Sequence, residues 1–506
     1  MTARSLSSLI AGGEAVAGHR PWPRTLISSD VWSEAAQQLH DGQLTLLGLW
    51  GEPNTVHMAV LDEGTWQLGV LTLVCRDGRF PSVGRLHPPA IRLERTIADF
   101  FGLVGDGAAD TRPWLDHGQW GVRHPLAGRA PAEKRPGTEY RFLPVEGEGL
   151  HQIPVGPVHA GIIEPGHFRF TANGEAVARL EERLGYVHKG IESLMAGATL
   201  ERGSQLAQRT SGDSVVAYGI AFARAAEAAS GIEAPPRAQW LRALMAELER
   251  IANHFGDFGA ICNDASFAVM HAQCGILRER VLRATRAAFG HRLMRDCVVP
   301  GGVAAEIAAE GRAAITAVLD EIRRRLPVLI ALYDNTTSLQ DRTVTTGVVK
   351  PELVKQWRPG GHVGRAGGRN FDTRRNLAYA PYDELAFDVP VLHESDVNAR
   401  VWIRIREIEQ STSLIEQILS RMPAGETRRP LAVPGGAEGL ALAEAFRGDV
   451  LIWLRAAAGG TIARCHLRDA SWFQWPLLEA AIEGNIVADF PLCNKSFNCS
   501  YSGHDL

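Results

Sequence analysis

The spacing of apolar residues changes once along the chain, and this change limits the folds that the sequence can adopt. In the first hundred residues, short apolar or alternating runs predict β-strands at Leu44–Leu49, Val56–Val60 and Trp66–Val74, followed by a short helix over Arg92–Leu103. Beyond residue 175 apolar residues recur at intervals of three and four, which is typical of helices. The sequence therefore predicts an α+β fold, with a small N-terminal α/β domain and a large, mainly helical domain with β edges.

Four segments carry the prediction for the large domain. One apolar stripe comprises Val177, Leu180, Leu184, Val187, Ile191 and Leu194, and a second comprises Leu241, Leu244, Leu248, Ile251 and Phe255. The second stripe follows Pro235-Pro236, which is a helix-start signal. We expect further helices over 304–332 and 397–419, and strands over 450–454 and 461–463.

A stretch rich in proline, glycine and charge separates the two parts. It covers residues 126–149 and has the composition of a linker. We therefore predict domains over 1–125 and 150–506, joined by this linker.

Charge and cysteine usage exclude several classes of protein. The formal net charge is −4 and no long basic run is present, which disfavours nucleic-acid binding. No apolar stretch approaches the roughly 20 residues that a membrane span needs, and Met1–Gly18 lacks the apolar segment of a secretory signal. The seven cysteines are scattered without a C-x-x-C pair. We expect a reducing, cytoplasmic location, and no metal or iron–sulfur cluster held by this chain alone.

Two polar groups stand beside the predicted stripes. His188 and Glu192 are four residues apart, so they lie on one face if that helix forms. They could be a buried structural pair or a proton-handling site. His254 and Asp264 lie near the end of the second stripe, where polar groups are either hydrogen-bonded within the core or line a cavity between helices. The residues alone leave these alternatives open.

Several segments in a fixed order carry a family resemblance. They include Arg92–Leu103, Gly156-Pro-Val-His159, Glu164–Phe168, Tyr186–Glu192, Glu249–His254, Pro300–Val303, Phe387–Pro390 and Asp396–Arg400. Together they resemble the 30-kDa and 49-kDa subunits of respiratory complex I fused in one chain. They equally resemble the fused large subunit of group 4 nickel–iron hydrogenases of the formate hydrogenlyase type. The resemblance spans almost the whole sequence.

The metal motifs of that family are altered here. In the hydrogenases an early R-x-C-G-x-C and a late S-x-D-P-C-x-x-C supply four thiolates; the corresponding stretches read Arg209-Thr-Ser-Gly-Asp-Ser214 and Ser496–Gly503. Thus Ser211, Ser214, Ser500 and Gly503 take the ligand positions, and Cys499 falls one residue early. Hydroxyls bind soft metals poorly. The resemblance implies a metal-less, hydrogenase-4-like member that is not a nickel–iron hydrogenase.

In complex I the equivalent cavity has no metal and accepts a quinone beside the terminal 4Fe-4S cluster of a neighbouring subunit. The quinone-contacting histidine of that family aligns with Ile163, and its tyrosine partner falls within 211–214, whereas its acidic residue is present as Asp264. The resemblance assigns proton-handling roles to Glu192, His159, Asp264 and Asp213. It assigns the former metal cavity, as a quinone pocket, to His188, Lys189, Arg209, Ser211, Ser214 and Ser500.

Two structural expectations follow from this assignment. Arg209–Ser214 and Ser500–Gly503 should be neighbours in space. Glu192 should line the cavity with His159 and with Asp213 or Asp264, and desolvation should raise its pKa.

The resemblance implies an oxidoreductase subunit that is not active alone, bound peripherally to the inner face of the cell membrane. Its partners would be an iron–sulfur small subunit, a ferredoxin-like subunit and antiporter-like membrane subunits. Electrons would pass from NAD(P)H or ferredoxin to a quinone and drive ion translocation. A non-catalytic structural subunit is the alternative, and a nickel–iron hydrogenase with altered ligands is a third hypothesis. A pocket with titratable groups favours the first, whereas a cavity filled by apolar side chains favours the second.

Overall fold

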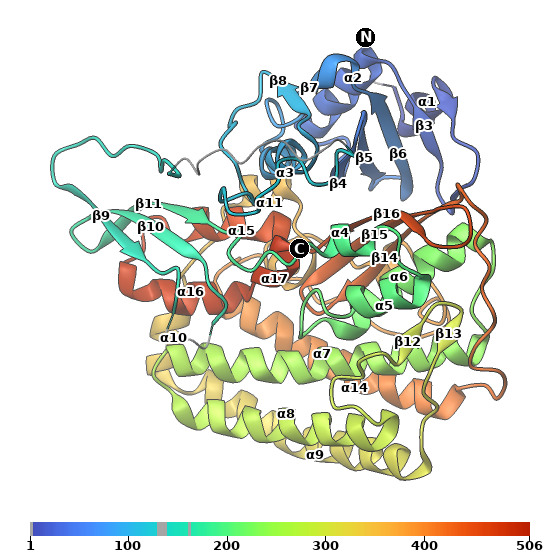
Figure 1. Cartoon of the computed structure of the whole chain (residues 1–506). Coiled ribbons are helices and arrows are strands. Elements are labelled where there is room, and N and C mark those ends of the chain that lie inside the picture. Colours follow the sequence, from blue (N-terminus) through green and yellow to red (C-terminus); the bar gives the residue numbers. More distant parts are fainter. Residues whose placement is uncertain (1–3, 129–138, 160–162) are drawn as a thin grey trace.

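The computed structural model describes residues 4–128, 139–159 and 163–506. Figure 1 shows the N-terminal part, in blue, above a layer of long helices at the bottom. The predicted α+β fold, with a smaller N-terminal part and a larger helical part, is confirmed. The predicted linker over 126–149 lies partly outside the described residues.

A five-stranded sheet in the order β1-β3-β6-β5-β4 forms the N-terminal part. The three strands predicted here are present, and β4 and β5 join through the two-residue Pro53-Asn54 loop, with Glu52 paired to Thr55. The predicted helix is α3, which packs on β4. The elements are α1 Leu6–Ala11, β1 Glu14–Ala15, β3 Arg24–Leu26, α2 Ser29–His40, β4 Thr45–Glu52, β5 Thr55–Asp62, β6 Gln67–Val74, β7 Arg79–Pro81, α3 Ile91–Phe101 and β8 Val104–Asp106.

The first predicted helical stripe is wrong over most of its length. Residues 177–183 belong to β11 (Ala176–Arg183), which pairs with β10 (His167–Asn173), which pairs in turn with β9 (Leu150–Val155). The cause is local: Asn173-Gly174 opens a two-residue hairpin turn, in which Gly174 has φ +58°. The stripe then crosses Gly185 (φ +97°) and Gly190 (φ +67°), and only the short α4 (Ile191–Met195) is helical.

Long helices form the lower layer and the centre of the molecule (Figure 1). They are α6 Val215–Ser230, α7 Pro236–Asp264, α8 Ala268–Phe289, α9 Ala309–Asp334 and α14 Val397–Arg421. The Pro235-Pro236 pair starts α7 as predicted, because proline fits the first helical turn, where no backbone donor is needed. The predicted helix over 304–332 is α9, which begins five residues later than predicted, after the short strand β13 (Gly302–Val303).

A second sheet, in the order β16-β15-β14-β2, packs against α6 through β14 and β15. Its strands are β2 His19–Arg20, β14 Glu438–Ala445, β15 Gly448–Ala456 and β16 Ile462–Arg468. The two predicted strands correspond to β15 and β16; β14 is additional, and β2 comes from the N-terminal segment and runs parallel to β14. A glycine allows close packing here, since a Cβ on Gly439 would lie 1.8 Å from the Ala225 carbonyl oxygen of α6.

Short elements complete the fold. They are α5 Leu200–Ala207, β12 Val298–Val299, β13 Gly302–Val303, α10 Thr337–Thr343, α11 Pro351–Trp357, α12 Gly361–Ala366, α13 Thr373–Asn376, α15 Ser471–Ala481, α16 Phe490–Phe497 and α17 Tyr501–Asp505. The C-terminus lies at the centre of the view in Figure 1, and the Leu506 carbonyl oxygen accepts hydrogen bonds from the Lys189 and Gly190 amides. The last residues are therefore part of the core.

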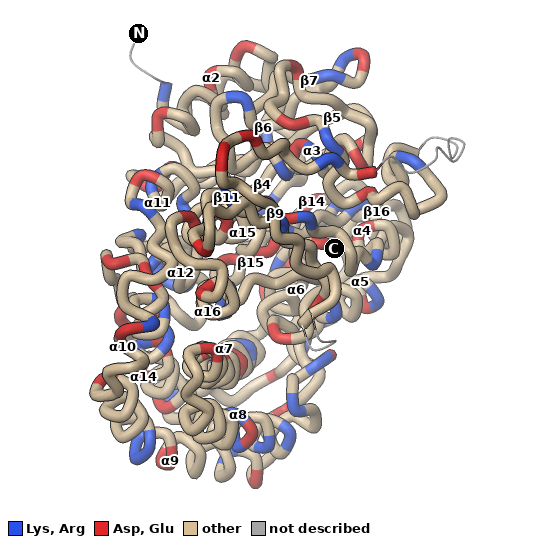
Figure 2. The backbone as a smooth tube through the Cα atoms, turned by 90° about the vertical axis from the view of Figure 1, so that its left-hand side faces the viewer, with Lys and Arg blue, Asp and Glu red and all other residues tan. Residues whose placement is uncertain are grey.

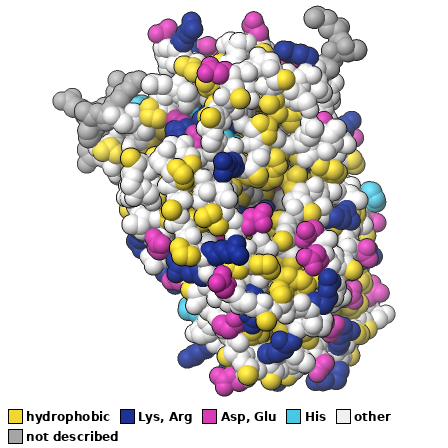
Figure 3. All heavy atoms as spheres, turned by 90° about the vertical axis from the view of Figure 1, so that its right-hand side faces the viewer, with side chains coloured by type: hydrophobic (Ala, Val, Ile, Leu, Met, Phe, Trp, Pro, Cys, Tyr) yellow, Lys and Arg dark blue, Asp and Glu magenta, His cyan; other side chains and the backbone are white. Residues whose placement is uncertain are grey.

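The surface carries both signs of charge. Basic and acidic residues are interspersed along the chain in Figure 2, and Figure 3 shows both kinds among apolar side chains on the opposite side. This agrees with the small net charge. Among the residues that the structure describes, every helix is too short or too polar to cross a lipid bilayer.

Candidate functional site

A cavity of about 620 Å³ opens between the β9–β10 sheet, the turn before α6 and the C-terminal helices α16 and α17. We call it the serine cavity, after Ser211 and Ser500. Its lining comprises Val155, His159, Ile163, Glu164, Phe168, Ser211, Gly212, Asp213, Asp264, Arg447, Phe490, Pro491, Asn494, Lys495, Asn498, Cys499, Ser500, Tyr501 and Ser502. Five of the residues singled out from the sequence are therefore brought together, namely His159, Ser211, Asp213, Asp264 and Ser500.

The early and late motif segments meet in this cavity, as predicted. The Ser211 and Ser500 hydroxyl oxygens are 2.9 Å apart, and the Ser211 hydroxyl donates to Asp213 Oδ1 at 2.8 Å. Ser500 is the N-cap of α17 and accepts from the Gly503 amide at 2.8 Å. Because the Ser211 proton is directed to Asp213, the Ser500 hydroxyl is the donor between the two serines.

An arginine fixes the charge of Asp213. Arg447, in the turn between β14 and β15, donates to both carboxylate oxygens of Asp213, with Nη1 at 2.7 Å and Nη2 at 2.5 Å. Burial by itself would raise the pKa of Asp213, but Arg447 and the Ser211 hydroxyl outweigh it and lower the pKa. The Asp213 side chain is 35% exposed, toward the cavity, whereas that of Arg447 is 4% exposed.

Groups of both signs line the remaining wall. His159 Nε2 lies 2.8 Å from the Gly166 carbonyl oxygen, and Glu164 accepts from the Ser502 amide at 3.1 Å. Burial raises the pKa of Asp264, and the nearby Lys495 ammonium offsets part of that rise. The cavity thus presents a carboxylate held in its charged form and a carboxyl group more readily protonated.

The one cysteine in the lining is a protonated thiol. Cys499 is buried, its Sγ lies 3.9 Å from Gln474 Oε1, and burial raises its pKa well above the ordinary range. A metal-binding cysteine needs the opposite shift, because the thiolate is the ligand.

The expectation that Glu192 lines this cavity is wrong. Glu192 faces a separate, almost filled space beneath α3, where Oε1 lies 2.8 Å from His466 Nδ1 and Oε2 lies 2.7 Å from Arg464 Nη2. The Leu467 amide also donates to Oε1, at 3.1 Å. Its partners come from β16, more than 270 residues further along the chain.

The expected direction of the Glu192 pKa shift is also wrong. Burial raises it, but the charges of Arg464 and His466 and the hydrogen bonds to Oε1 outweigh burial, and the pKa falls to about 2. The side chain is 2% exposed. Glu192 is therefore a fixed carboxylate between the N-terminal domain and β16.

Four other predicted residues lie outside the cavity lining. His188 Nδ1 is 2.7 Å from the Asp505 carbonyl oxygen, and its ring stacks on Trp120. Lys189 Nζ donates to the Thr210 carbonyl oxygen at 2.9 Å. Arg209 forms a two-pronged ion pair with Asp296, both distances being 2.7 Å. Ser214 is buried at the start of α6, where its hydroxyl lies 3.4 Å from Arg447.

The polar lining residues that the sequence analysis did not assign to the site include Glu164, Arg447, Lys495 and Tyr501. Glu164 lies within a segment that carries the family resemblance, so the sequence did contain a signal that could have identified it. Arg447 occupies a β-turn and Lys495 one turn of a short helix, so neither has a spacing that indicates its partner. Only the fold brings them to Asp213 and Asp264.

A chain of hydrogen bonds leads from the serine cavity into the helical core. Arg447 Nε donates to the Asn498 carbonyl oxygen, the Asn498 side chain donates to Asp257 at 2.8 Å, and Arg404 donates to Asp257 at 3.0 Å. Further in, Glu407 lies 2.6 Å from His254. His254 is therefore hydrogen-bonded within the core, which is one of the two alternatives left open by the sequence.

Comparisons with known proteins agree with the fold. The family model described as "Respiratory-chain NADH dehydrogenase, 30 Kd subunit" matches residues 27–136, and the one described as "Respiratory-chain NADH dehydrogenase, 49 Kd subunit" matches residues 266–433. Hydrogenase-4 component G of Escherichia coli is 29% identical over 92% of this chain and 84% of that protein. An NADH-quinone oxidoreductase subunit of Desulfotalea psychrophila is 30% identical over 67% of this chain and 92% of that protein.

A solved structure has the same fold. A chain in the "Structure of the membrane-bound sulfane sulfur reductase (MBS), an archaeal respiratory membrane complex" aligns with a TM-score of 0.67 at 24% identity, over 72% of this chain and all of that one. The relatives include subunits of membrane-bound hydrogenases and of NADH-quinone oxidoreductases. The chain belongs to the family of fused complex I 30-kDa/49-kDa-like and membrane-bound hydrogenase large subunits.

Proposed function

We propose that the chain is the large electron-transfer subunit of a membrane-attached, complex I-like oxidoreductase that has no nickel–iron centre. Its serine cavity would receive a small organic electron acceptor, a quinone headgroup. One observation carries the proposal: Ser211 and Ser500, at positions where the family's hydrogenases have metal thiolates, form a hydroxyl pair 2.9 Å apart in an open cavity lined by titratable groups.

The groups at this position fit a nickel–iron centre poorly. The Ser211 and Ser500 hydroxyls hydrogen-bond to each other, and Ser211 also donates to Asp213. Gly503 has no side-chain ligand atom. Cys499 is a protonated thiol whose sulfur contacts Gln474 instead of the serines. Hydroxyls rarely lose their protons, and soft metals prefer thiolates. These features support a metal-less site over a hydrogenase with altered ligands.

The same groups fit an acceptor that takes up protons. Reducing a quinone to a quinol consumes two electrons and two protons. The electrons would come from the 4Fe-4S cluster expected in the adjacent small subunit. Ser500, Ser211 and Asp213 form a continuous chain of hydrogen-bonded oxygens. For this hydrogen-bonded chain to deliver a proton to a bound carbonyl oxygen, Asp213 would first take one from solvent at its exposed edge, and both hydroxyls would then reverse direction, so that Ser500 donates to the ligand. The second proton would come from Asp264, whose pKa is raised. Lys495 or His159 can hold the oxygen in place.

The location, partners and electron donor that we propose follow from the family. The chain would lie at the inner face of the membrane with an iron–sulfur small subunit, a ferredoxin-like subunit and antiporter-like membrane subunits. NAD(P)H or ferredoxin would supply the electrons, and reduction would drive ion translocation. Titratable groups in the cavity support this function over a purely structural subunit.

The test uses the complex purified from its host through a tag on this chain. We expect iron from the partner subunit but no stoichiometric nickel, no hydrogen uptake, and reduction of decylubiquinone or menadione by NADH or reduced ferredoxin. Asp213→Asn should lower the turnover about 100-fold, whereas the exposed Glu201→Gln should leave it unchanged. About one nickel per chain would restore the hydrogenase hypothesis. Full turnover in an assembled Asp213→Asn complex would contradict the proposal and support the alternative that the chain is a structural subunit.

A further inference from the structure

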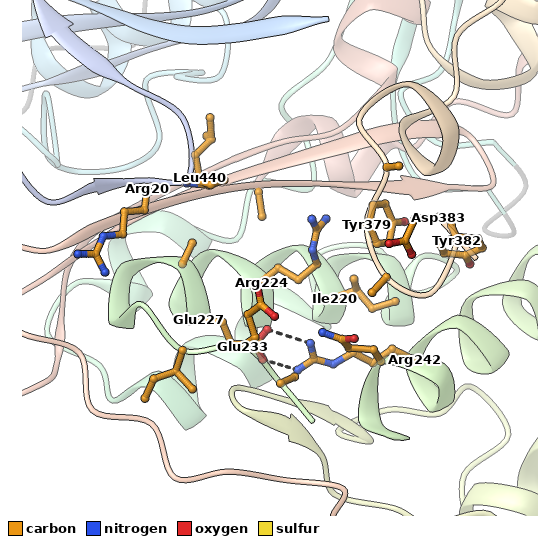
Figure 4. A pocket seen from close by; sticks show the side chains of 18 of the residues that line it. Arg20, Ile220, Arg224, Glu227, Glu233, Arg242, Tyr379, Tyr382, Asp383 and Leu440 are labelled. Carbon is orange, nitrogen blue, oxygen red and sulfur yellow. Dashed lines mark hydrogen bonds and ion pairs between the residues drawn. The ribbon is translucent and has the colours of Figure 1, made fainter. Parts of the chain in front are cut away.

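A second cavity, of about 640 Å³, lies along α6 and shares no lining residue with the serine cavity. It is bounded by α6, the start of α7, the loop 378–383 and β14, and we call it the Arg224 pocket. Figure 4 shows Arg224 rising from α6 beside Tyr379, with the Glu227–Arg242 pair below. Its volume lies within the range of about 300–1,000 Å³ that is usual for small-molecule sites.

The central polar group of this pocket has no acidic partner. Among the residues that the structure describes, no carboxylate lies within ion-pair distance of the Arg224 guanidinium. Nη1 donates to the Leu442 carbonyl oxygen at 2.5 Å, and the guanidinium carbon lies 4.0 Å from the centroid of the Tyr379 ring. These contacts leave the Nη2 and Nε donors without an acceptor in the described part of the chain. Burial lowers the pKa of Arg224, so the surroundings disfavour its charge.

The neighbouring Arg242, unlike Arg224, has a carboxylate partner in the described part of the chain. Arg242, in the second turn of α7, pairs with Glu227 at 2.6 Å and 3.0 Å and also donates to the Val299 and Gly302 carbonyl oxygens. Glu227 is thus held by Arg242, and it favours the charge of Arg224 only from beyond ion-pair distance. The open donors of Arg224 face the cavity from a partly exposed side chain, so an anion that enters the cavity could form charge-assisted hydrogen bonds with them.

The rest of the pocket suits an apolar or aromatic body. Ile220 lies on α6 next to Arg224, and Leu440 and Ala441 of β14 form part of the wall. Tyr379 and Tyr382 close one side; the Tyr382 hydroxyl is already used, since it donates to Glu247 at 2.6 Å. A ligand would therefore find one charged anchor with open donors and an apolar wall formed by Ile220 and Leu440, within a lining that also carries polar groups.

The rim carries charges of both signs. Arg20 of β2 packs on Gly231, the residue that caps the C-terminal end of α6. Gly231 lies about 10 Å along the helix axis from Arg224. Glu233 and Asp383 are exposed to solvent, where water and salt screen them. They do not cancel the charge of the deeper Arg224.

We propose that the Arg224 pocket binds a small organic anion. Its carboxylate or phosphate would accept hydrogen bonds from the free donors of Arg224, and its apolar or aromatic body would lie against Ile220 and Leu440 beside Tyr379. This site is independent of the serine cavity and of the function proposed for it.

The test measures binding to the full chain in its purified complex by titration calorimetry. The probes are benzoate, phenyl phosphate and the neutral benzamide. We expect at least one anion to bind 10-fold or more tightly than benzamide, the gain of a charge-assisted hydrogen bond. The tighter anion then identifies the headgroup as carboxylate or phosphate. Arg224→Gln should reduce its affinity to that of benzamide, whereas Arg202→Gln, an exposed arginine of α5, should leave it unchanged.

A second variant covers the case in which Arg224→Gln does not fold. Ala228→Trp places a large side chain in the pocket without altering a charge, and it should abolish binding of both anions. The proposal is overturned if benzamide binds as tightly as the anions, or if Ala228→Trp or folded Arg224→Gln retains anion binding. It is equally overturned if neither anion binds the unaltered chain at about 10 mM.

Discussion

The hydroxyl oxygens of Ser211 and Ser500 lie 2.9 Å apart although 289 residues separate them in sequence. Each serine lies just before a helix: Ser211 begins the turn that leads into α6, and Ser500 is the N-cap of α17. The contact therefore depends on how two fixed chain segments pack, rather than on flexible side chains.

The first prediction tests this contact by cross-linking. In a Ser211→Cys/Ser500→Cys double variant, the two sulfurs would take positions near those of the hydroxyl oxygens, within reach of a disulfide. We expect a mild oxidant to link the two peptides, as detected by mass spectrometry of a non-reduced digest. Neither single variant should give this linked pair. Two freely reactive thiols without a cross-link would show that the segments are further apart.

The second prediction concerns the pH dependence of stability. Glu192 has a pKa of about 2 in the folded chain against an ordinary value of 4.5. A lowered pKa stabilises the fold above the ordinary value, here by about 3 kcal/mol. This contribution is lost as the pH falls from 4.5 through 2, with about 1.4 kcal/mol lost by pH 3.5.

Glu192→Gln should therefore lower the free energy of unfolding by about 3 kcal/mol at pH 7, and by less at pH 3.5. Urea unfolding at both pH values measures the difference. Glu201→Gln is the matched control, because its carboxylate is 66% exposed and lies 3.8 Å from Arg428; it should change stability by less than about 0.5 kcal/mol. An equal loss at both pH values would contradict the lowered pKa.

How far the sequence predicts this molecule depends on whether a signal is local. The hairpin of β10 and β11 had a local signal in Asn173-Gly174, but the apolar spacing of Val177, Leu180 and Leu184 fits a helix equally well. The error arose because both faces of β11 are buried near its end, so the alternation typical of a half-exposed strand is lost.

Partners that are distant in sequence account for the errors at the site. Glu192 belongs to a segment that carries the family resemblance, but its partners in the structure are Arg464 and His466 of β16. No residue spacing in the sequence indicates this contact. The meeting of Ser211 with Ser500 was predicted correctly, because the motif order of the family contains that long-range information. The residues alone do not.

The third prediction concerns the seven cysteines. All are buried, and burial raises the pKa of Cys75 to about 12 and of Cys297 and Cys493 to about 11. At pH 8 only about one thiol in a thousand or fewer would be a thiolate. Iodoacetamide should therefore label the native chain very slowly and all seven cysteines after denaturation, whereas an added Ala378→Cys on the surface should react at once. Rapid native labelling of Cys499 would mean that the cavity holds a thiolate.

The last prediction concerns the junction of the two sheets. Glu438 of β14 accepts from Arg24 of β3 at 2.7 Å and 2.8 Å, and from Arg455 of β15 at 2.8 Å. Arg455 reaches back to Glu52 of β4 at 2.5 Å and 2.8 Å, so four charges join the N-terminal sheet to the second sheet. The Glu438 side chain is 3% exposed and that of Arg24 is 7% exposed.

Glu438→Gln removes the charge shared by two arginines and leaves Arg24 without a carboxylate in a buried position. A buried charge that loses its partner is costly, so we expect a loss of about 3 kcal/mol or more in the free energy of unfolding. We also expect faster cleavage between the two parts by a protease at low concentration. Glu416→Gln breaks the exposed Glu416–Arg323 pair and should change neither measurement, because exposed pairs contribute little. If Glu438→Gln behaves like Glu416→Gln, then apolar packing between the sheets holds the two parts together, and the four charges only set their register.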